Sequence, residues 1–331
     1  MLKLLEMPDV AMNMILEKLD YIDVQRLRKT CWTIRNFIDD SNFDSFLTRI
    51  DIRISDYINF DFTFGDDDEK IQIQYKKFDN NGCKIVIYEN YKNRQKVLEN
   101  QDFVDLAFRD FQSILSFQKS ILHFLNIDFR SKSGSSNIPE RFQNILKFRK
   151  IKTKTFRTTV TRELEILSIL PFLDSTHLKS LIIFNGQGDI INELETSEFV
   201  ESEQWKNLET LTIRNFVVDI PIQNLKHLKR IYVAFEEITM DMVLELKEAF
   251  LTSESLQEFK IDFDSQKIEQ NLAEVFGEPF TDHDGFGQER KKWFFKIPNF
   301  ENRVLLISLN LYCIIFYRNW TENVPENVVM N

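Results

Sequence analysis

Leu208–Arg214 (LETLTIR) carries the pattern that decides the fold of most of the chain: apolar residues at its first, fourth and sixth positions. Four other stretches share this apolar-x-x-apolar-x-apolar core. They are Ile121–Asp128 (ILHFLNID), Leu178–Phe184 (LKSLIIF), Leu228–Ala234 (LKRIYVA) and Leu256–Asp262 (LQEFKID). Alternating apolar residues predict short strands with one buried face. The C-terminal two-thirds of the chain is therefore predicted to contain a repeated strand.

Stretches with helical spacing lie between these strands, at Glu163–Leu170, Phe199–Trp205 and Met240–Leu251. A strand and a helix per unit, stacked so that neighbouring units bury each other's apolar faces, is the arrangement of leucine-rich repeats. The irregular intervals between units leave open an ordinary α/β domain whose strands share Leu and Ile. Both alternatives predict parallel strands covered by helices. Lys292–Ile297 and Val304–Phe316 are expected to add strands after the last unit.

Upstream of the repeats, the sequence predicts an antiparallel sheet. Arg49–Phe64 (RIDIRISDYINFDFTF) alternates apolar and polar residues, and Ile71–Tyr75 and Cys83–Tyr88 repeat that alternation around the turn signal Asn80-Asn81-Gly82. The acidic run at residues 65–69 lacks the ligand spacing of a calcium loop and is interpreted as a hairpin loop. Residues 131–137 (SKSGSSN) are expected to form a long loop.

The first forty residues predict short helices. Apolar residues recur at helical spacing from Pro8 to Leu19, and Asp23 is suited to cap a second helical segment that runs towards Ile38. Leu4, Leu5 and the residues just after them have no obvious partner within so small a segment. They are expected to pack either on the rest of this chain or on another protein.

Composition and charge favour a folded protein with a protein partner. The 331 residues include 31 Phe but only 8 Gly and 7 Pro, which disfavours disorder. The formal charge of −10 disfavours nucleic acid and anionic membranes as partners. Three scattered cysteines form no metal or disulfide motif, and the N-terminus lacks the apolar run of a signal peptide. These features predict a cytoplasmic or nuclear protein.

The N-terminal residues resemble an F-box. The Met-Pro opening at Met7-Pro8, the Ile-Leu and Leu-Asp pairs that end the first helix, and Leu27-Arg28-x-x-Cys31 followed by Trp32 and Arg35 all occur in the family's order. The resemblance implies three helices that bind a Skp-type adaptor. The positions that match the motif's apolar residues are Leu5, Met7, Pro8, Val10, Ile15, Leu16, Leu19, Leu27, Cys31 and Ile34. The sequence does not separate those that would face the adaptor from those that hold the helices together.

Gln204-Trp205-Lys206, followed by Leu208–Ile213, resembles the Gln-Trp-Lys signature of the FTH domain, which accompanies F-boxes in a large nematode family. Phe117–Phe129 and Ile169–Asp174 resemble other segments of that domain. The resemblance implies an interaction domain and assigns no substrate-binding residue. The predicted organisation is an F-box at residues 1–42, connecting antiparallel strands at 43–110 and an FTH, leucine-rich-repeat-like domain at 111–331. The fold class is thus α+β or α/β.

The resemblance implies a substrate-recognition adaptor of a Skp/cullin/F-box ubiquitin ligase. Its partners would be the Skp-type adaptor, a cullin held through it, and an unknown target protein. An alternative is a protein-interaction module that uses the F-box outside ubiquitination. An enzyme is not expected, because the sequence has no phosphate-binding loop, metal-site motif or nucleophile motif, and no cofactor is predicted.

A basic stretch at residues 141–162 contains no acidic residue. In it Lys150, Lys152 and Lys154 are predicted to share one strand face. They could recognise an acidic or phosphorylated partner, but a solvated strand face is the simpler interpretation.

Overall fold

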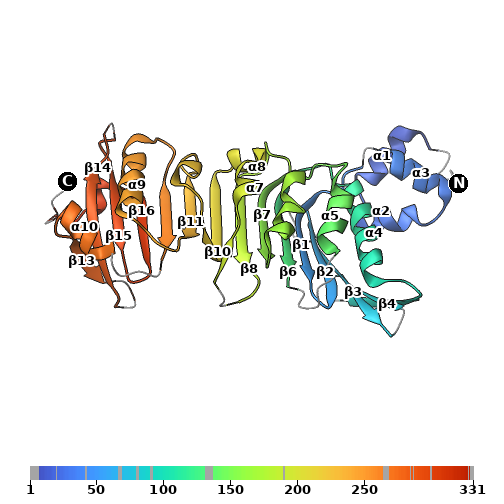
Figure 1. Ribbon diagram of the computed structural model, residues 1–331. Coiled ribbons are helices and arrows are strands. Elements are labelled where there is room, and N and C mark those ends of the chain that lie inside the picture. Colours follow the sequence, from blue (N-terminus) through green and yellow to red (C-terminus); the bar gives the residue numbers. More distant parts are fainter. Residues whose placement is uncertain are drawn as a thin grey trace. The chain divides into compact units, whose positions relative to one another are not determined.

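The computed structural model describes residues 7–19, 21–41, 43–65, 69–79, 82–89, 92–130, 137–188, 191–263, 268–283, 285, 287–298, 300–326 and 328 (Figure 1). The chain divides into two compact units, Met1–Leu125 and Asn126–Asn331. N-terminal helices are followed by sheets with interspersed helices, so the predicted α+β class is confirmed. Asn80, Asn81 and residues 66–68 and 131–136, on which turn and loop predictions fell, lie outside the described residues.

The first unit begins with the three predicted helices, α1 (Asp9–Leu16), α2 (Tyr21–Arg28) and α3 (Trp32–Asp40). Each helix buries two side chains. They are Met12 and Leu16 of α1, Tyr21 and Val24 of α2, and Ile34 and Ile38 of α3. The face of α1 that carries Val10 and Met14 is exposed. Pro8 precedes α1 and Asp9 lies in its first turn, where a carboxylate favours the positive helix end.

An antiparallel meander follows the helices, as predicted. Its strands lie side by side in chain order: β1 (Leu47–Ile54), β2 (Tyr57–Phe64), β3 (Glu69–Phe78), β4 (Gly82–Glu89) and β5 (Lys92–Glu99). Ile50, Ile52 and Ile54 are buried, in agreement with the alternation seen in the sequence. β5 (KNRQKVLE) forms the outer edge of this meander and is exposed along nearly its whole length.

Helix α4 (Phe103–Ser116), which the sequence analysis did not predict, packs on the meander. The Asp102 carboxylate caps it by accepting from the backbone N–H groups of Val104 and Asp105, both at 2.9 Å. Phe111 stacks on Phe60 of β2 with 5.4 Å between ring centroids. Apolar residues at three- and four-residue steps after a capping Asp were visible in the sequence and could have revealed this helix.

The second unit contains the predicted parallel strands, β7 (Thr153–Val160), β8 (Ser180–Asn185), β10 (Thr210–Val218), β11 (Arg230–Ala234) and β12 (Glu258–Asp262). They pair in that order, and the short β9 (Asn192–Leu194) adds to β10. Because each strand lies beside the next one along the chain, the units stack as in a repeat protein rather than as in a doubly wound sheet. β6 (Leu122–Phe129) runs across the boundary of the two units.

The repeated apolar pattern forms one buried row. Leu181, Leu211, Ile231 and Phe259 are paired neighbours on successive strands, and each is at most 2% exposed. Short helices connect the strands: α5 (Ile138–Leu146), α6 (Glu163–Leu167), η2 (Leu170–Phe172), α7 (Ser197–Val200), α8 (Glu203–Lys206), η3 (Ile222–Asn224), α9 (Met240–Thr252) and α10 (Ile268–Phe276). Aligned buried side chains on stacked strands are the source of stability in such repeats.

The C-terminal strands continue the sheet with antiparallel pairing. β16 (Cys313–Trp320) lies beside β12, and β15 (Arg303–Leu309), β14 (Glu289–Lys296) and β13 (Phe280–His283) follow outward, with η4 (Thr321–Asn323) after β16. Phe316 of β16 stacks on Phe250 of α9, which places α9 on the side of the buried row. Among the described residues, no helix is long and apolar enough to cross a membrane.

Candidate functional site

Helix α2 is attached to the meander that follows the N-terminal helices. Tyr21 of α2 stacks on Phe64 of β2, with 5.5 Å between ring centroids. Burial raises the pKa of the Tyr21 hydroxyl above its ordinary value. The Arg28 guanidinium lies 5.6 Å from the centre of the Phe117 ring, which follows α4. The side of α2 that faces the meander is therefore occupied by the chain itself.

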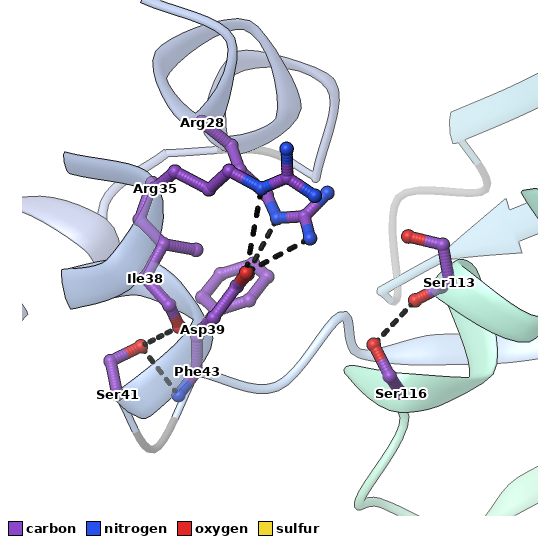
Figure 2. A network of polar contacts seen from close by, with 8 residues as sticks. All are labelled: Arg28, Arg35, Ile38, Asp39, Ser41, Phe43, Ser113 and Ser116. Carbon is purple, nitrogen blue, oxygen red and sulfur yellow. Dashed lines mark hydrogen bonds and ion pairs between the residues drawn. The ribbon is translucent and has the colours of Figure 1, made fainter. Parts of the chain in front are cut away.

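An ion-pair cluster holds α2 to α3 (Figure 2). Arg28 donates from Nε and Nη2 to the two oxygens of Asp39, at 2.5 and 3.0 Å, and Arg35 Nε lies 3.7 Å from the same carboxylate. These hydrogen bonds raise the pKa of Arg28. The Leu-Arg element of the F-box resemblance thus contributes an arginine whose contacts lie within this chain.

The segment that leaves α3 is attached to the residues after α4. Ser45 donates from its hydroxyl to Gln118 Oε1 at 2.6 Å and from its backbone N–H to the Phe117 carbonyl at 2.8 Å. Gln118 also exchanges two hydrogen bonds with the backbone of Leu47, both at 3.0 Å. These bonds attach the segment after α3 and the start of β1 to the residues that follow α4.

Burial divides the ten residues that match the F-box motif. Leu16 and Ile34 are buried in the helical core, and Met7, Ile15, Leu19 and Leu27 are partly buried. Pro8, Val10 and Cys31 are exposed. Leu5 lies outside the described residues.

Exposed apolar side chains occur at two positions on the described part of the N-terminal helices, on α1 and at the start of α3. Val10 and Met14 are four residues apart, on one face of α1, and are 72% and 62% exposed. Trp32, the first residue of α3, follows the N-cap residue Cys31 and is 73% exposed. Met14 and Trp32 are not among the ten positions predicted from the sequence, because helical spacing alone does not tell a buried face from an exposed one. Exposed aromatic and long aliphatic side chains are typical anchors of protein interfaces.

Comparison with known proteins identifies two domains in the chain. Residues 4–46 match the model of the F-box domain, and residues 136–280 match that of the FTH domain. The predicted F-box and FTH domain are confirmed. The chain is 26% identical over 215 residues to F-box A protein 224 of Caenorhabditis elegans, a match that covers 64% of this chain and 55% of that relative. No solved structure matches significantly. Proteins with these two domains are typically adaptors rather than enzymes.

The Gln-Trp signature of the FTH domain joins successive repeats. Gln204 is buried and donates from Nε2 to the carbonyls of Leu173 and Pro171, at 2.8 and 3.2 Å. Trp205 is buried and donates from Nε1 to the carbonyl of Asn224 at 3.1 Å. Gln204 therefore forms hydrogen bonds with the preceding repeat, and Trp205 forms one with the following repeat. This structural role accounts for both side chains without a ligand contact.

The parallel strands have a second face, opposite the buried row, that is here called the open face. Its side chains alternate with those of the buried row and are partly or fully exposed. Those used below are Arg157, Phe184, Arg214, Arg230, Tyr232 and Lys260. Lys152 and Lys154 alternate with Thr153 and Thr155 and so project to the other side of the chain from Arg157. Lys150, Lys152 and Lys154 are all exposed.

Two hollows flank these strands. One of about 640 Å³ is lined by Arg230, Arg303 and Arg318 together with Glu254 and Glu258. The other, of about 750 Å³, lies at the carboxyl ends of the strands, and its charged lining is entirely acidic. It comprises Glu193, Asp219, Glu236, Glu237 and Glu245. The second unit thus has a purely acidic hollow at the carboxyl ends of its strands and a hollow of mixed charge elsewhere.

Two histidines of the second unit have structural partners. His177 Nδ1 lies 2.9 Å from Asp174, and His227 Nε2 lies 3.0 Å from the carbonyl of Trp205. In the described part of the chain no three His, Cys, Asp or Glu residues are placed to hold a metal ion. Burial raises the pKa of the Cys83 and Cys313 thiols.

Proposed function

We propose that this chain is the substrate-recognition adaptor of a Skp/cullin/F-box ubiquitin ligase. Its F-box binds the Skp-type adaptor, which is held by a cullin, and its FTH domain binds the target protein. The observation that carries the proposal is the exposed apolar surface on helices that match the F-box. The free state of all three cysteines supports the cytoplasm or nucleus as the site of action.

The adaptor-binding residues in this proposal are the exposed ones. Val10 and Met14 of α1 and Trp32 of α3 have large apolar side chains that this chain leaves in water. Burying them against the Skp-type adaptor would remove apolar surface from water, at about 25 cal/mol per Å². Leu16, Ile34 and Arg28 act indirectly, because they keep the three helices in place.

A binding measurement with purified Skp-type adaptor tests the proposal. The variant Val10→Glu/Met14→Glu places two charges in the interface without disturbing the core, so we expect affinity to fall at least about tenfold. Leu244→Glu/Val275→Glu is the matched control, because these residues are also exposed apolar positions on helices and lie in the other unit. Wild-type affinity in the first variant, or no binding by the wild-type chain, would disprove the F-box role.

Copurification of a cullin with the adaptor-bound chain separates the ligase from a module that acts outside ubiquitination. We expect the ternary complex to form and to transfer ubiquitin to a bound target. A chain that binds the Skp-type adaptor but excludes the cullin would support the alternative.

A further inference from the structure

Three arginines on the open face meet no carboxylate among the residues that the structure describes. Arg157 of β7, Arg214 of β10 and Arg230 of β11 form no ion pair with any described residue. Arg214 and Arg230 are exposed, and Arg157 is partly buried with no hydrogen-bond partner for its Nε. Elsewhere in the chain many arginines lie beside carboxylates, as Arg28 does with Asp39.

Aromatic rings hold two of these guanidinium groups in place. Arg157 lies 4.5 Å from the centre of the Phe184 ring, and Arg214 lies 4.6 Å from that of Tyr232. Lys260 approaches Tyr232 as well, at 4.4 Å. A guanidinium stacked on a ring keeps its N–H donors free at the edges, and it loses little further freedom when it binds a carboxylate. Lys260 is already paired, because its Nζ lies 3.6 Å from the Asp262 carboxylate. The open face therefore presents two ordered guanidinium groups, those of Arg157 and Arg214, that meet no carboxylate among the described residues.

The spacing of these cations suits an extended chain. Arg157, Arg214 and Lys260 occupy β7, β10 and β12, which are alternate strands in the order of the sheet. Neighbouring strands lie about 4.8 Å apart, so successive cations are separated by roughly 10 Å across the strands. Residues three apart in a polyproline II segment, an extended conformation with three residues per turn, lie on one side of the segment and about 9 Å apart.

We propose that the open face binds an extended acidic segment of the target protein. This inference rests on the proposed target-binding role and specifies the chemistry of the target. Acidic side chains at every third position would each meet one cation, through charge-assisted hydrogen bonds to Arg157 and Arg214. The acidic hollow at the carboxyl ends of the strands repels such a segment and confines it to the open face.

Fluorescence anisotropy with the full chain tests this proposal. The probe is a labelled, extended peptide in which glutamate occupies every third position between serine and glycine, and its glutamine counterpart is the neutral comparison. We expect the acidic probe to bind at least about tenfold more tightly than the neutral one. We also expect its affinity to fall as salt is raised. Equal affinities would overturn the proposal.

Paired variants locate the binding surface. Arg157→Gln/Arg214→Gln should weaken binding of the acidic probe about tenfold or more. If this double variant does not fold, Arg214→Gln alone replaces it, because Arg214 is exposed. The single variant should also weaken binding of the acidic probe. Lys152→Gln/Lys154→Gln removes the same charge from the other side of the chain, at the start of β7, and should leave affinity nearly unchanged. Equal losses in both pairs, or a loss confined to the lysine pair, would contradict the assignment.

Two further measurements separate the remaining outcomes. Single-stranded RNA that bound more tightly than the acidic peptide would overturn the choice of a protein ligand. Binding of the Skp-type adaptor, measured on the same preparations, should be unchanged in all these variants. Failure of the peptide to bind while the Skp-type adaptor still binds would reject this inference and leave the F-box role intact.

Discussion

At the scale of single residues, burial separates side chains that look alike in the sequence. Leu16 and Val10 are both aliphatic and both match the F-box motif, yet Leu16 is 2% exposed and Val10 is 72% exposed. The first is part of the helical core and the second is available to a partner. Substitution of Leu16 should therefore impair folding, whereas substitution of Val10 should impair binding alone.

Cys31 offers a test of the proposed interface that needs no substitution. It is exposed at the start of α3, beside Trp32, whereas Cys83 and Cys313 are buried. A thiol reagent should modify one cysteine in the folded chain and all three after unfolding. Saturating Skp-type adaptor should slow modification of Cys31 several-fold, measured by mass spectrometry. An unchanged rate in a complex that is shown to form would place the interface away from α3.

Asp174 should contribute to the pH dependence of stability. Hydrogen bonds from Thr176 and His177 hold the pKa of its carboxyl well below the ordinary value of about 4. The unfolded chain then binds more protons than the folded chain just below that value, so the contribution is present above about pH 4 and is lost as pH falls. In Asp174→Asn the free energy of unfolding should depend less steeply on pH in acid. Identical pH profiles for both proteins would contradict this role.

At the scale of elements, α8 joins three repeats through Gln204 and Trp205. Gln204→Leu keeps the bulk of the side chain but leaves the carbonyls of Leu173 and Pro171 without their donor. We expect the free energy of unfolding to fall by about 1–3 kcal/mol. Equilibrium urea unfolding measures this change. Lys206→Leu, on the same short helix but exposed, should remain within about 0.5 kcal/mol of wild type.

The sequence predicts the elements with strong local periodicity. The parallel strands follow from the Leu-x-x-Leu-x-Ile pattern, because Leu211 and its neighbours form a single buried row. Helix α4 was overlooked, although Asp102 and the spacing of Phe108 and Phe111 signalled it. The exposure of Met14 and Trp32 could not be predicted, since it depends on which helix faces pack on α2 and the meander. Which arginines of the open face meet no carboxylate among the described residues also depends on the register between strands distant in sequence.

At the scale of the whole molecule, the two proposed tasks belong to different units. The F-box lies in Met1–Leu125 and the matched FTH residues lie in Asn126–Asn331. Variants at Val10 and Arg214 therefore test separate steps, recruitment to the ligase and capture of the target. An adaptor of this kind accelerates ubiquitin transfer by raising the effective concentration of the target near the ubiquitin carrier.

The charged outer edge of the meander affects the tendency of the chain to aggregate at high concentration. A bare edge strand offers its backbone hydrogen-bonding groups to strands of other molecules, which is a route to fibrils. β5 carries Lys92, Arg94 and Lys96 along this edge, and Val97 and Leu98 are its only aliphatic residues. A second molecule that added its own strand there would have to strip water from these cations. We expect overexpressed chain to resist growth into intermolecular ribbons at this edge.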